Sequence, residues 1–100
     1  MQFVISGFMI RSFADSDTQK LFELERVRRW ANIERQALRK LTQLDLAQTL
    51  GDMRAPPGNR LEALSGNRKG QWSIRVNDQY RICFTWTDEG PAEVEIVDYH

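Results

Sequence analysis

Arg75 and Arg81 are the first residues whose type and position suggest chemistry. They lie in two segments, 72–76 and 80–86, in which apolar and polar side chains alternate as in β-strands with one buried face. A two-residue connection would mix apolar and charged side chains on one face, whereas a three-residue loop, Asn77–Gln79, keeps the apolar ones together. Because the buried pattern sets the register, we predict an antiparallel hairpin with Arg75 directly opposite Arg81.

Two facing arginines indicate a site for an anion. Like charges in directly opposite positions destabilise a sheet, and arginine presents a planar fork of donors that matches phosphate. An anion between the two side chains would resolve the repulsion. The alternative is that a nearby carboxylate, from Glu62, Glu93 or Glu95, neutralises them.

The last three residues, Asp98-Tyr99-His100, could supply an acid catalyst. The carboxylate of Asp98 and the terminal carboxylate both favour the protonated imidazolium of His100. A protonated histidine is a general acid, and Tyr99 can stack on a base or donate a hydrogen bond. Chain ends often fray, so an unstructured terminus is the alternative.

Several other chemistries are excluded by composition. One cysteine and one histidine cannot form a disulfide framework or the usual zinc spacings. We find no phosphate-cradling glycine loop and no Ser-His-Asp order, and we expect Cys83 to be a packed, inert thiol. No metal or other cofactor is therefore expected. No apolar run is long enough to span a membrane, and the lack of disulfides favours the cytoplasm.

The charge distribution agrees with an anion-binding surface. The 100 residues, 41% hydrophobic and 28% charged, are typical of one small globular domain with zero net charge. Twelve of the fourteen Lys and Arg lie in residues 26–81, which hold five acids, whereas residues 82–100 hold five acids and no Lys or Arg. A basic region beside an acidic one favours an anionic partner. The alternative is a solvated surface with a regional imbalance.

The sequence before the predicted strands indicates two helices, which must pack against the sheet that carries Arg75 and Arg81. Ser16 and Gln19 have the spacing of a capping box, and apolar residues continue at helical spacing to Trp30. Asn32 can cap a second helix, which Gly51 can end. The second helix has one apolar stripe, formed by Ile33, Ala37, Leu41 and Leu44.

Short strands follow the helices. Residues 72–97 predict a three-stranded antiparallel meander with a turn at 88–91. Residues 10–13 suggest a first short strand, and 60–64 a short extended segment. Residues 65–70 are expected to form a loop.

Two stretches of the sequence resemble a known family. LEALSGNRKGQWSIRVNDQYRICFTW, residues 61–86, and VEIVDYH, residues 94–100, resemble the RelE superfamily of bacterial type II toxins, and within it the HigB branch. Met9–Phe13 resembles the usual start of that branch, so residues 9–100 are expected to form one domain and residues 1–8 an N-terminal extension. The resemblance implies an α+β fold, a twisted antiparallel sheet with two N-terminal helices packed on one face.

The resemblance also implies an activity and partners. The chain would be a ribosome-dependent mRNA endonuclease that needs no metal, is silenced by a HigA-type helix-turn-helix antitoxin, and meets operator DNA only through that antitoxin. No membrane partner is implied. In such cleavage the 2′-hydroxyl attacks the neighbouring phosphate, so the protein must remove one proton, supply another and stabilise a pentacoordinate phosphate.

The family roles fall on residues that the resemblance covers. Arg75 and Arg81 would hold the phosphate charge, His100 would be the acid, and Tyr99 would stack on or orient a base. The implied RNA- or phosphate-binding residues are Arg68, Lys69 and Asp98.

One departure from the family concerns the general base. Glu62 stands where some HigB toxins carry a catalytic histidine, and Ser65 where they carry a lysine. Glu62 can be a base, as in the similar YoeB branch, or it can simply pair with Arg75 or Arg81. Loss of the lysine would remove one phosphate-stabilising charge and weaken activity.

Two functions remain open on the sequence: the endonuclease, or a non-catalytic module of the same fold that binds RNA or an antitoxin. A cationic helical face, distinct from the sheet, is expected to bind acidic groups of the antitoxin. Its residues are Arg28, Arg29, Arg35 and Arg39.

Overall fold

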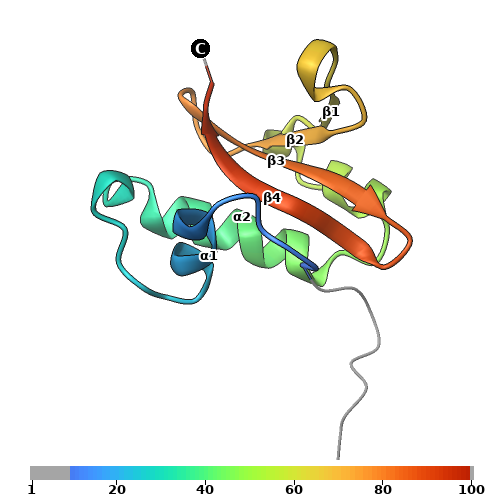
Figure 1. Ribbon diagram of the computed structural model, residues 1–100. Helices are drawn as coiled ribbons and strands as arrows, with labels where there is room; N and C mark the ends of the chain where they lie inside the picture. The colour runs from blue at the N-terminus through green and yellow to red at the C-terminus, as the bar shows by residue number, and fades with distance from the viewer. Residues whose placement is uncertain (1–9, 100) are drawn as a thin grey trace, which may run out of the picture.

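In the computed structural model, which describes residues 10–99, two α-helices pack against one face of a twisted antiparallel sheet (Figure 1). This is the expected α+β class. The helices are α1 (Ser16–Phe22) and α2 (Glu34–Leu46), and the strands are β1 (Glu62–Ala63), β2 (Trp72–Arg75), β3 (Tyr80–Thr87) and β4 (Gly90–Asp98). Short 3₁₀ turns, η1 (Arg28–Trp30), η2 (Leu50–Arg54), η3 (Pro57–Asn59) and η4 (Gly66–Arg68), join them. The expected extension at residues 1–8 lies outside the described residues.

The N-cap of helix α1 is one residue earlier in the sequence than expected. The N-cap is Asp15, whose carboxylate accepts from the backbone N–H of Thr18 at 3.0 Å and from its hydroxyl at 2.6 Å. The predicted capping box of Ser16 and Gln19 is therefore wrong, because the neighbouring carboxylate takes the cap position. The Thr18 hydroxyl also accepts from the N–H of Ile96 at 3.0 Å, which ties α1 to β4.

Helix α1 ends at Phe22, well before the predicted end at Trp30. The N–H of Glu25 donates to the carbonyl of Lys20 at 2.8 Å, and the N–H of Leu24 to that of Leu21 at 3.1 Å, which is the Schellman pattern of a helix end. Leu24 takes the left-handed conformation of that motif, with φ of +70°. Trp30 is buried from η1 instead of from the helix.

Helix α2 is shorter than its predicted limits, Asn32 and Gly51. It begins after Ile33, which makes no side-chain capping bond, and it ends at Leu46. Thr49 then starts η2 in a reciprocal capping box with Asp52, so Gly51 lies inside a new turn. The predicted apolar stripe is confirmed: Ile33, Ala37, Leu41 and Leu44 are all buried.

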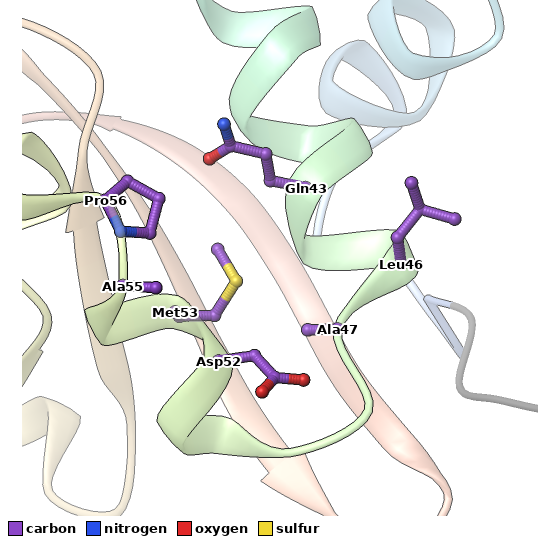
Figure 2. Close-up of a pocket in the computed structure, with 7 residues that line it drawn as sticks. All are labelled: Gln43, Leu46, Ala47, Asp52, Met53, Ala55 and Pro56. Atoms are coloured by element: carbon purple, nitrogen blue, oxygen red, sulfur yellow. The ribbon is translucent and has the colours of Figure 1, made fainter.

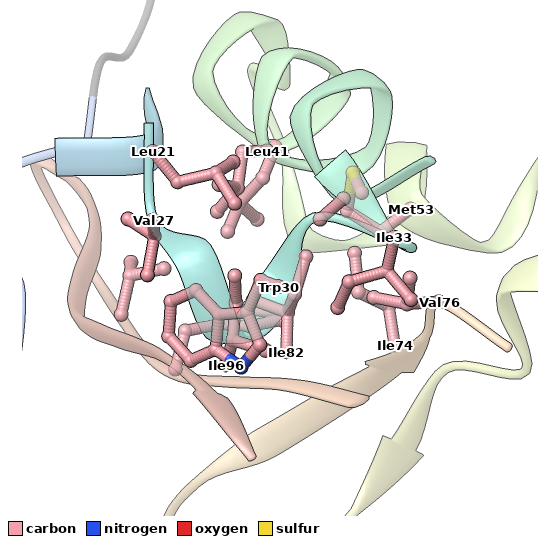
Figure 3. Close-up of a cluster of buried hydrophobic side chains, with 14 of the residues drawn as sticks. Leu21, Val27, Trp30, Ile33, Leu41, Met53, Ile74, Val76, Ile82 and Ile96 are labelled. Carbon is pink, nitrogen blue, oxygen red and sulfur yellow. The ribbon is translucent and has the colours of Figure 1, made fainter. Parts of the chain in front are cut away.

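The core lies between the helices and one face of the sheet. Figure 3 shows Leu41 of α2 and Trp30 of η1 above Ile74, Ile82 and Ile96 of the strands. Burying an aliphatic or aromatic side chain of this size contributes about 1.5–3 kcal/mol. The cluster fixes which face of each strand is inward and leaves the opposite face for polar side chains.

The strand register confirms the predicted hairpin. Ile74 lies opposite Ile82, and Arg75 lies opposite Arg81. The sheet has the strand order β1-β2-β3-β4, because the extended segment predicted at residues 60–64 adds β1 to the edge of β2, with Glu62 opposite Ser73. The expected three-stranded meander is thus part of a four-stranded sheet.

The outer edge of β4 is irregular. The turn expected at residues 88–91 is tighter, since Gly90 and Pro91 already belong to β4. A register shift between Cys83 and Thr85 accompanies a φ of +52° at Glu93, as in a β-bulge. The strand expected at residues 10–13 is reduced to a single parallel bridge from Phe13 to Val94. Among residues 10–99, no helix is long and apolar enough to cross a membrane.

Candidate active site on the polar face of the sheet

The polar face of the sheet brings chemistry-bearing residues from all four strands into two rows. Side chains on one face recur at every second position, so the pairing fixes the members of each row. One row runs across Glu62, Ser73, Cys83 and Glu95, and the next across Arg75, Arg81 and Val97.

Arg81 is the centre of this face. Its Nη1 lies 2.7 Å from Oε1 of Glu62, and its Nη2 donates to the carbonyl of Arg60 at 2.7 Å. Its guanidinium lies over the ring of Tyr99, 5.2 Å from the centroid, a cation–π arrangement. The side chain is only 10% exposed. Arg81 is therefore held rigidly, unlike an ordinary arginine on an open sheet.

One donor of Arg81 remains unused. Its Nε is buried and has no hydrogen-bond partner within residues 10–99, and the buried hydroxyl of Ser73 lacks one too. Buried polar atoms are nearly always hydrogen-bonded in proteins. The Nε of Arg81 is closed off from the surface, so an acceptor from outside would reach it only if the side chain moved.

Each of the two facing arginines, Arg75 and Arg81, already forms an ion pair with a carboxylate. Glu62 neutralises Arg81, whereas the side chain of Arg75 pairs with Asp78 of the hairpin loop. Of the carboxylates considered from sequence, Glu62 is the neutralising one, and Asp78 was missed. The repulsion between the arginines therefore does not by itself require an anion. Because Asp78 is 99% exposed, its ion pair contributes little free energy and opens readily.

Arg68 attaches the η4 loop to the sheet. Its Nη1 donates to Glu95 at 2.8 Å and to Gln71 at 2.9 Å, and the hydrogen bond to Glu95 raises the pKa of Arg68. The buried thiol of Cys83 has a raised pKa, chiefly because burial disfavours the thiolate. This agrees with the expected inert cysteine.

A polar pocket of about 350 Å³ opens beside Arg81. It is lined by Glu62, Ala63, Leu64, Ser65, Arg68 and Tyr99. The structure thus brings together Glu62, Arg68 and Tyr99, which the sequence singled out. It also adds the carbonyl of Arg60, for which the sequence gave no signal, since a backbone acceptor is independent of residue type.

The chain near its end continues the strand pairing. The N–H of Tyr99 donates to the carbonyl of Gln79 at 2.6 Å, and Asp98 accepts from the Gln79 amide at 3.1 Å. These bonds hold Tyr99, which is 44% exposed, at the pocket. The predicted acid, His100, lies outside the described residues. Lys69 is exposed on the loop and does not line the pocket.

The four arginines expected to bind an antitoxin lie on the helical side of the molecule. Arg28 and Arg29 belong to η1, and Arg35 and Arg39 to α2, and all four are exposed. Arg29 is already engaged: it pairs with Asp17 at 3.2 Å and lies 4.2 Å over the ring of Trp30. Within the described part of the chain, no group of three or more His, Cys, Asp or Glu could hold a metal ion.

Known proteins match this chain in sequence and in fold. A family model described as the RelE-like toxin of type II toxin–antitoxin system HigB matches residues 11–100. Toxin HigB-1 of Vibrio cholerae is 46% identical over 94 residues, which cover 92% of this chain and 98% of that protein. An uncharacterized protein of Haemophilus influenzae is 36% identical over 56 residues, 56% of this chain and 55% of that one. The YoeB/ParE toxin from Agrobacterium tumefaciens superposes with a TM-score of 0.51 over 93% of this chain and 99% of its own; at 17% identity it shows the fold alone.

Proposed function

Because the chain belongs to the HigB-like family of RelE-like toxins of type II toxin–antitoxin systems, we propose that it is a ribosome-dependent mRNA endonuclease. The observation that carries the proposal is that Glu62 and Tyr99, which line one polar pocket on the sheet, both contact Arg81 beside it. A base, a charge stabiliser and a stacking surface lie together there.

Glu62 is the proposed general base. It would take the proton from the 2′-hydroxyl of the nucleotide before the scissile phosphate. Its side chain is 54% exposed, so substrate can reach it, and the ion pair to Arg81 engages Oε1. No hydrogen bond or ion pair within residues 10–99 engages Oε2. Arg81 thus orients the carboxylate while one oxygen stays free to accept the proton.

The arginines would stabilise the charge that develops on the pentacoordinate phosphate. Arg81 would present its positive charge from beside the pocket, and Arg75 becomes available when the phosphate displaces the exposed carboxylate of Asp78. A charge that other contacts already hold in place, as those of Arg81 do, stabilises a transition state without reorganisation. Arg68 would add a third donor from the pocket wall. Ser65 lines the pocket but carries no charge. The lysine that some family members have there would add a further donor to the phosphate, so we expect weaker activity from this chain.

Tyr99 and the chain end would complete the site. One face of the Tyr99 ring meets Arg81, and its exposed part can stack on a base, which is worth about 1–3 kcal/mol per base. His100 would protonate the departing 5′-oxygen. Lys69 and Asp98 would adjust the local charge around the RNA.

The proposed partners follow from the family. A HigA-type antitoxin would silence the toxin through the arginine face of η1 and α2, and would carry it to operator DNA. The substrate is mRNA in the decoding site of the ribosome, so the toxin would act in the cytoplasm.

The experiment uses ribosomes programmed with one message and the purified chain. We expect cleavage at a defined site, a 2′,3′-cyclic phosphate on the upstream fragment, and no cleavage when the nucleotide before the cut carries a 2′-deoxy sugar. Cleavage of the 2′-deoxy message would refute the proposed attack.

A non-catalytic binding module is the second candidate. It is favoured by one observation: Arg68, Arg75 and Arg81 each already pair with a carboxylate, as in a surface built for stability. Binding of the programmed ribosome with an intact message would select this function.

A further inference from the structure

The outer face of α2 carries one exposed leucine, Leu46, and one half-buried leucine, Leu38, among polar side chains. Helical spacing places its members opposite the buried stripe of Ala37, Leu41 and Leu44. Leu46 on this face is 71% exposed. The members of the face are Arg35, Leu38, Arg39, Thr42, Gln43 and Leu46, and we call them the α2 groove.

The groove is a hollow that continues towards η2. Its six residues border a shallow, open hollow of about 510 Å³. A second hollow of about 320 Å³ lies between α2 and η2 and shares Gln43 and Leu46 with the first. Figure 2 shows these two side chains on the helix across from Met53 and Pro56. Extended apolar depressions on a protein surface often mark sites of interaction with another molecule.

Gln43, at the junction of the two hollows, has an unsatisfied acceptor. Its Oε1 is buried and has no hydrogen-bond partner within residues 10–99. A small adjustment of the amide would let it accept from a donor seated in the hollow, which would relieve an otherwise unfavourable burial.

The cations of the groove lack carboxylate partners. Arg35 and Arg39 stand one helical turn apart, at a spacing where like charges repel, and no ion pair involves either one among the described residues. The arginines of the sheet face, in contrast, are each paired. The groove thus presents uncompensated positive charge beside exposed leucine.

We propose that the α2 groove binds an amphipathic, acidic segment of the antitoxin, which places apolar side chains against Leu38 and Leu46 and carboxylates beside Arg35 and Arg39. This inference rests on the proposed function, which makes an antitoxin the partner. It adds the apolar contact, at Leu38 and Leu46, that the arginine face alone does not provide. A second copy of this chain fits poorly, because a two-fold contact centred on α2 would bring the same arginines together. RNA fits poorly as well, because its phosphates gain nothing from the leucines.

The test titrates purified HigA-type antitoxin into the full chain and two variants. Leu46→Glu puts a charge into the groove, and Leu24→Glu is the matched control, since Leu24 is 77% exposed and lies outside the groove. We expect Leu46→Glu to weaken binding about 30-fold or more, as for a central anchor, and Leu24→Glu to change it less than about threefold. Both variants should melt like the parent and cleave mRNA at its rate.

The outcomes separate this inference from the proposed function. If the antitoxin binds the parent and Leu46→Glu equally, the groove is not its site, although the toxin assignment stands. If the parent itself does not bind antitoxin, the partner in the proposed function fails as well. If Leu46→Glu instead turns a dimer of the free chain into a monomer, or lowers cleavage, the groove belongs to a second copy or to the ribosome, and the inference is overturned.

Discussion

The sheet face and the α2 groove use arginine in opposite ways. On the sheet, Arg81 is 10% exposed and held by Glu62, by a backbone carbonyl and by Tyr99. In the groove, Arg35 and Arg39 are exposed and have no ion-pair partner among the described residues. One region has fixed its cations before any ligand arrives, whereas the other leaves them to be neutralised by a ligand.

This difference separates a site suited to catalysis from one suited to association. Fixed donors favour a transition state because they need no rearrangement. Free cations on an exposed helix face instead raise the association rate of an acidic partner and favour it over other partners. Salt weakens both effects. Substitutions in the two regions should therefore change different measurements.

Deletion of His100 should have the largest effect on the sheet side of this comparison. Cleavage on programmed ribosomes should fall about 10²–10⁴-fold, as expected for a lost general acid. Antitoxin affinity and the melting temperature should not change. Equal cleavage by the deleted and full chains would remove His100 from the mechanism and leave Tyr99 or solvent as the acid.

Arg81→Ala should reduce both activity and stability. For an arginine exposed on an open sheet face, substitutions alter stability by no more than about 0.5 kcal/mol. The burial of Arg81 and its two strong contacts change that expectation. We expect a loss of about 2 kcal/mol, or roughly 10 °C in melting temperature, and about 10²–10³-fold in cleavage. A variant that melts like the parent would show that these contacts contribute no stability.

Arg75→Ala should separate activity from stability. Within residues 10–99 its only ion pair is with the fully exposed Asp78, so the melting temperature should stay within the equivalent of about 0.5 kcal/mol. Cleavage should fall about 10- to 100-fold, because one phosphate donor is lost. Asp78→Ala serves as the control, and it should leave cleavage intact. Unchanged cleavage by Arg75→Ala would limit the phosphate site to Arg81 and Arg68.

The smallest effect is expected in the groove. Replacing both Arg35 and Arg39 by Ala should weaken antitoxin binding about 3- to 10-fold at low salt. The difference from the parent should shrink as salt is added, because the lost contribution is electrostatic. A difference that is constant across salt concentrations would contradict the role assigned to these charges.

The sequence predicted the register of the site better than its contacts. The three-residue loop after Val76 followed from alternation alone, and it places Arg75 opposite Arg81 as expected. Neutralisation of Arg75 by Asp78 was not foreseen, because the turn conformation that brings the two together is not visible in an alternating pattern. The Arg60 carbonyl was equally hidden, since it depends on a left-handed residue with φ of +47°.

The helix ends were predicted less well, for local reasons. Leu21, Leu24 and Val27 have helical spacing, yet Leu24 takes the left-handed position that ends α1 and is exposed. Spacing alone cannot distinguish an apolar residue in a helix from one buried by a following loop. Asp15 and Ser16 are both good caps, and only the backbone geometry decides between them.

Cleavage by Glu62→Gln tests the central claim, that the sheet face cuts RNA with Glu62 as the base. Glutamine keeps an oxygen for the contact with Arg81 but cannot accept the proton of the 2′-hydroxyl. The variant should melt somewhat below the parent, because Arg81 keeps an acceptor but loses its counter-charge, and it should bind the programmed ribosome equally while its cleavage rate falls about 10²–10⁴-fold. Cleavage at the parental rate would show that Glu62 only pairs with Arg81, and that the proposed mechanism is wrong.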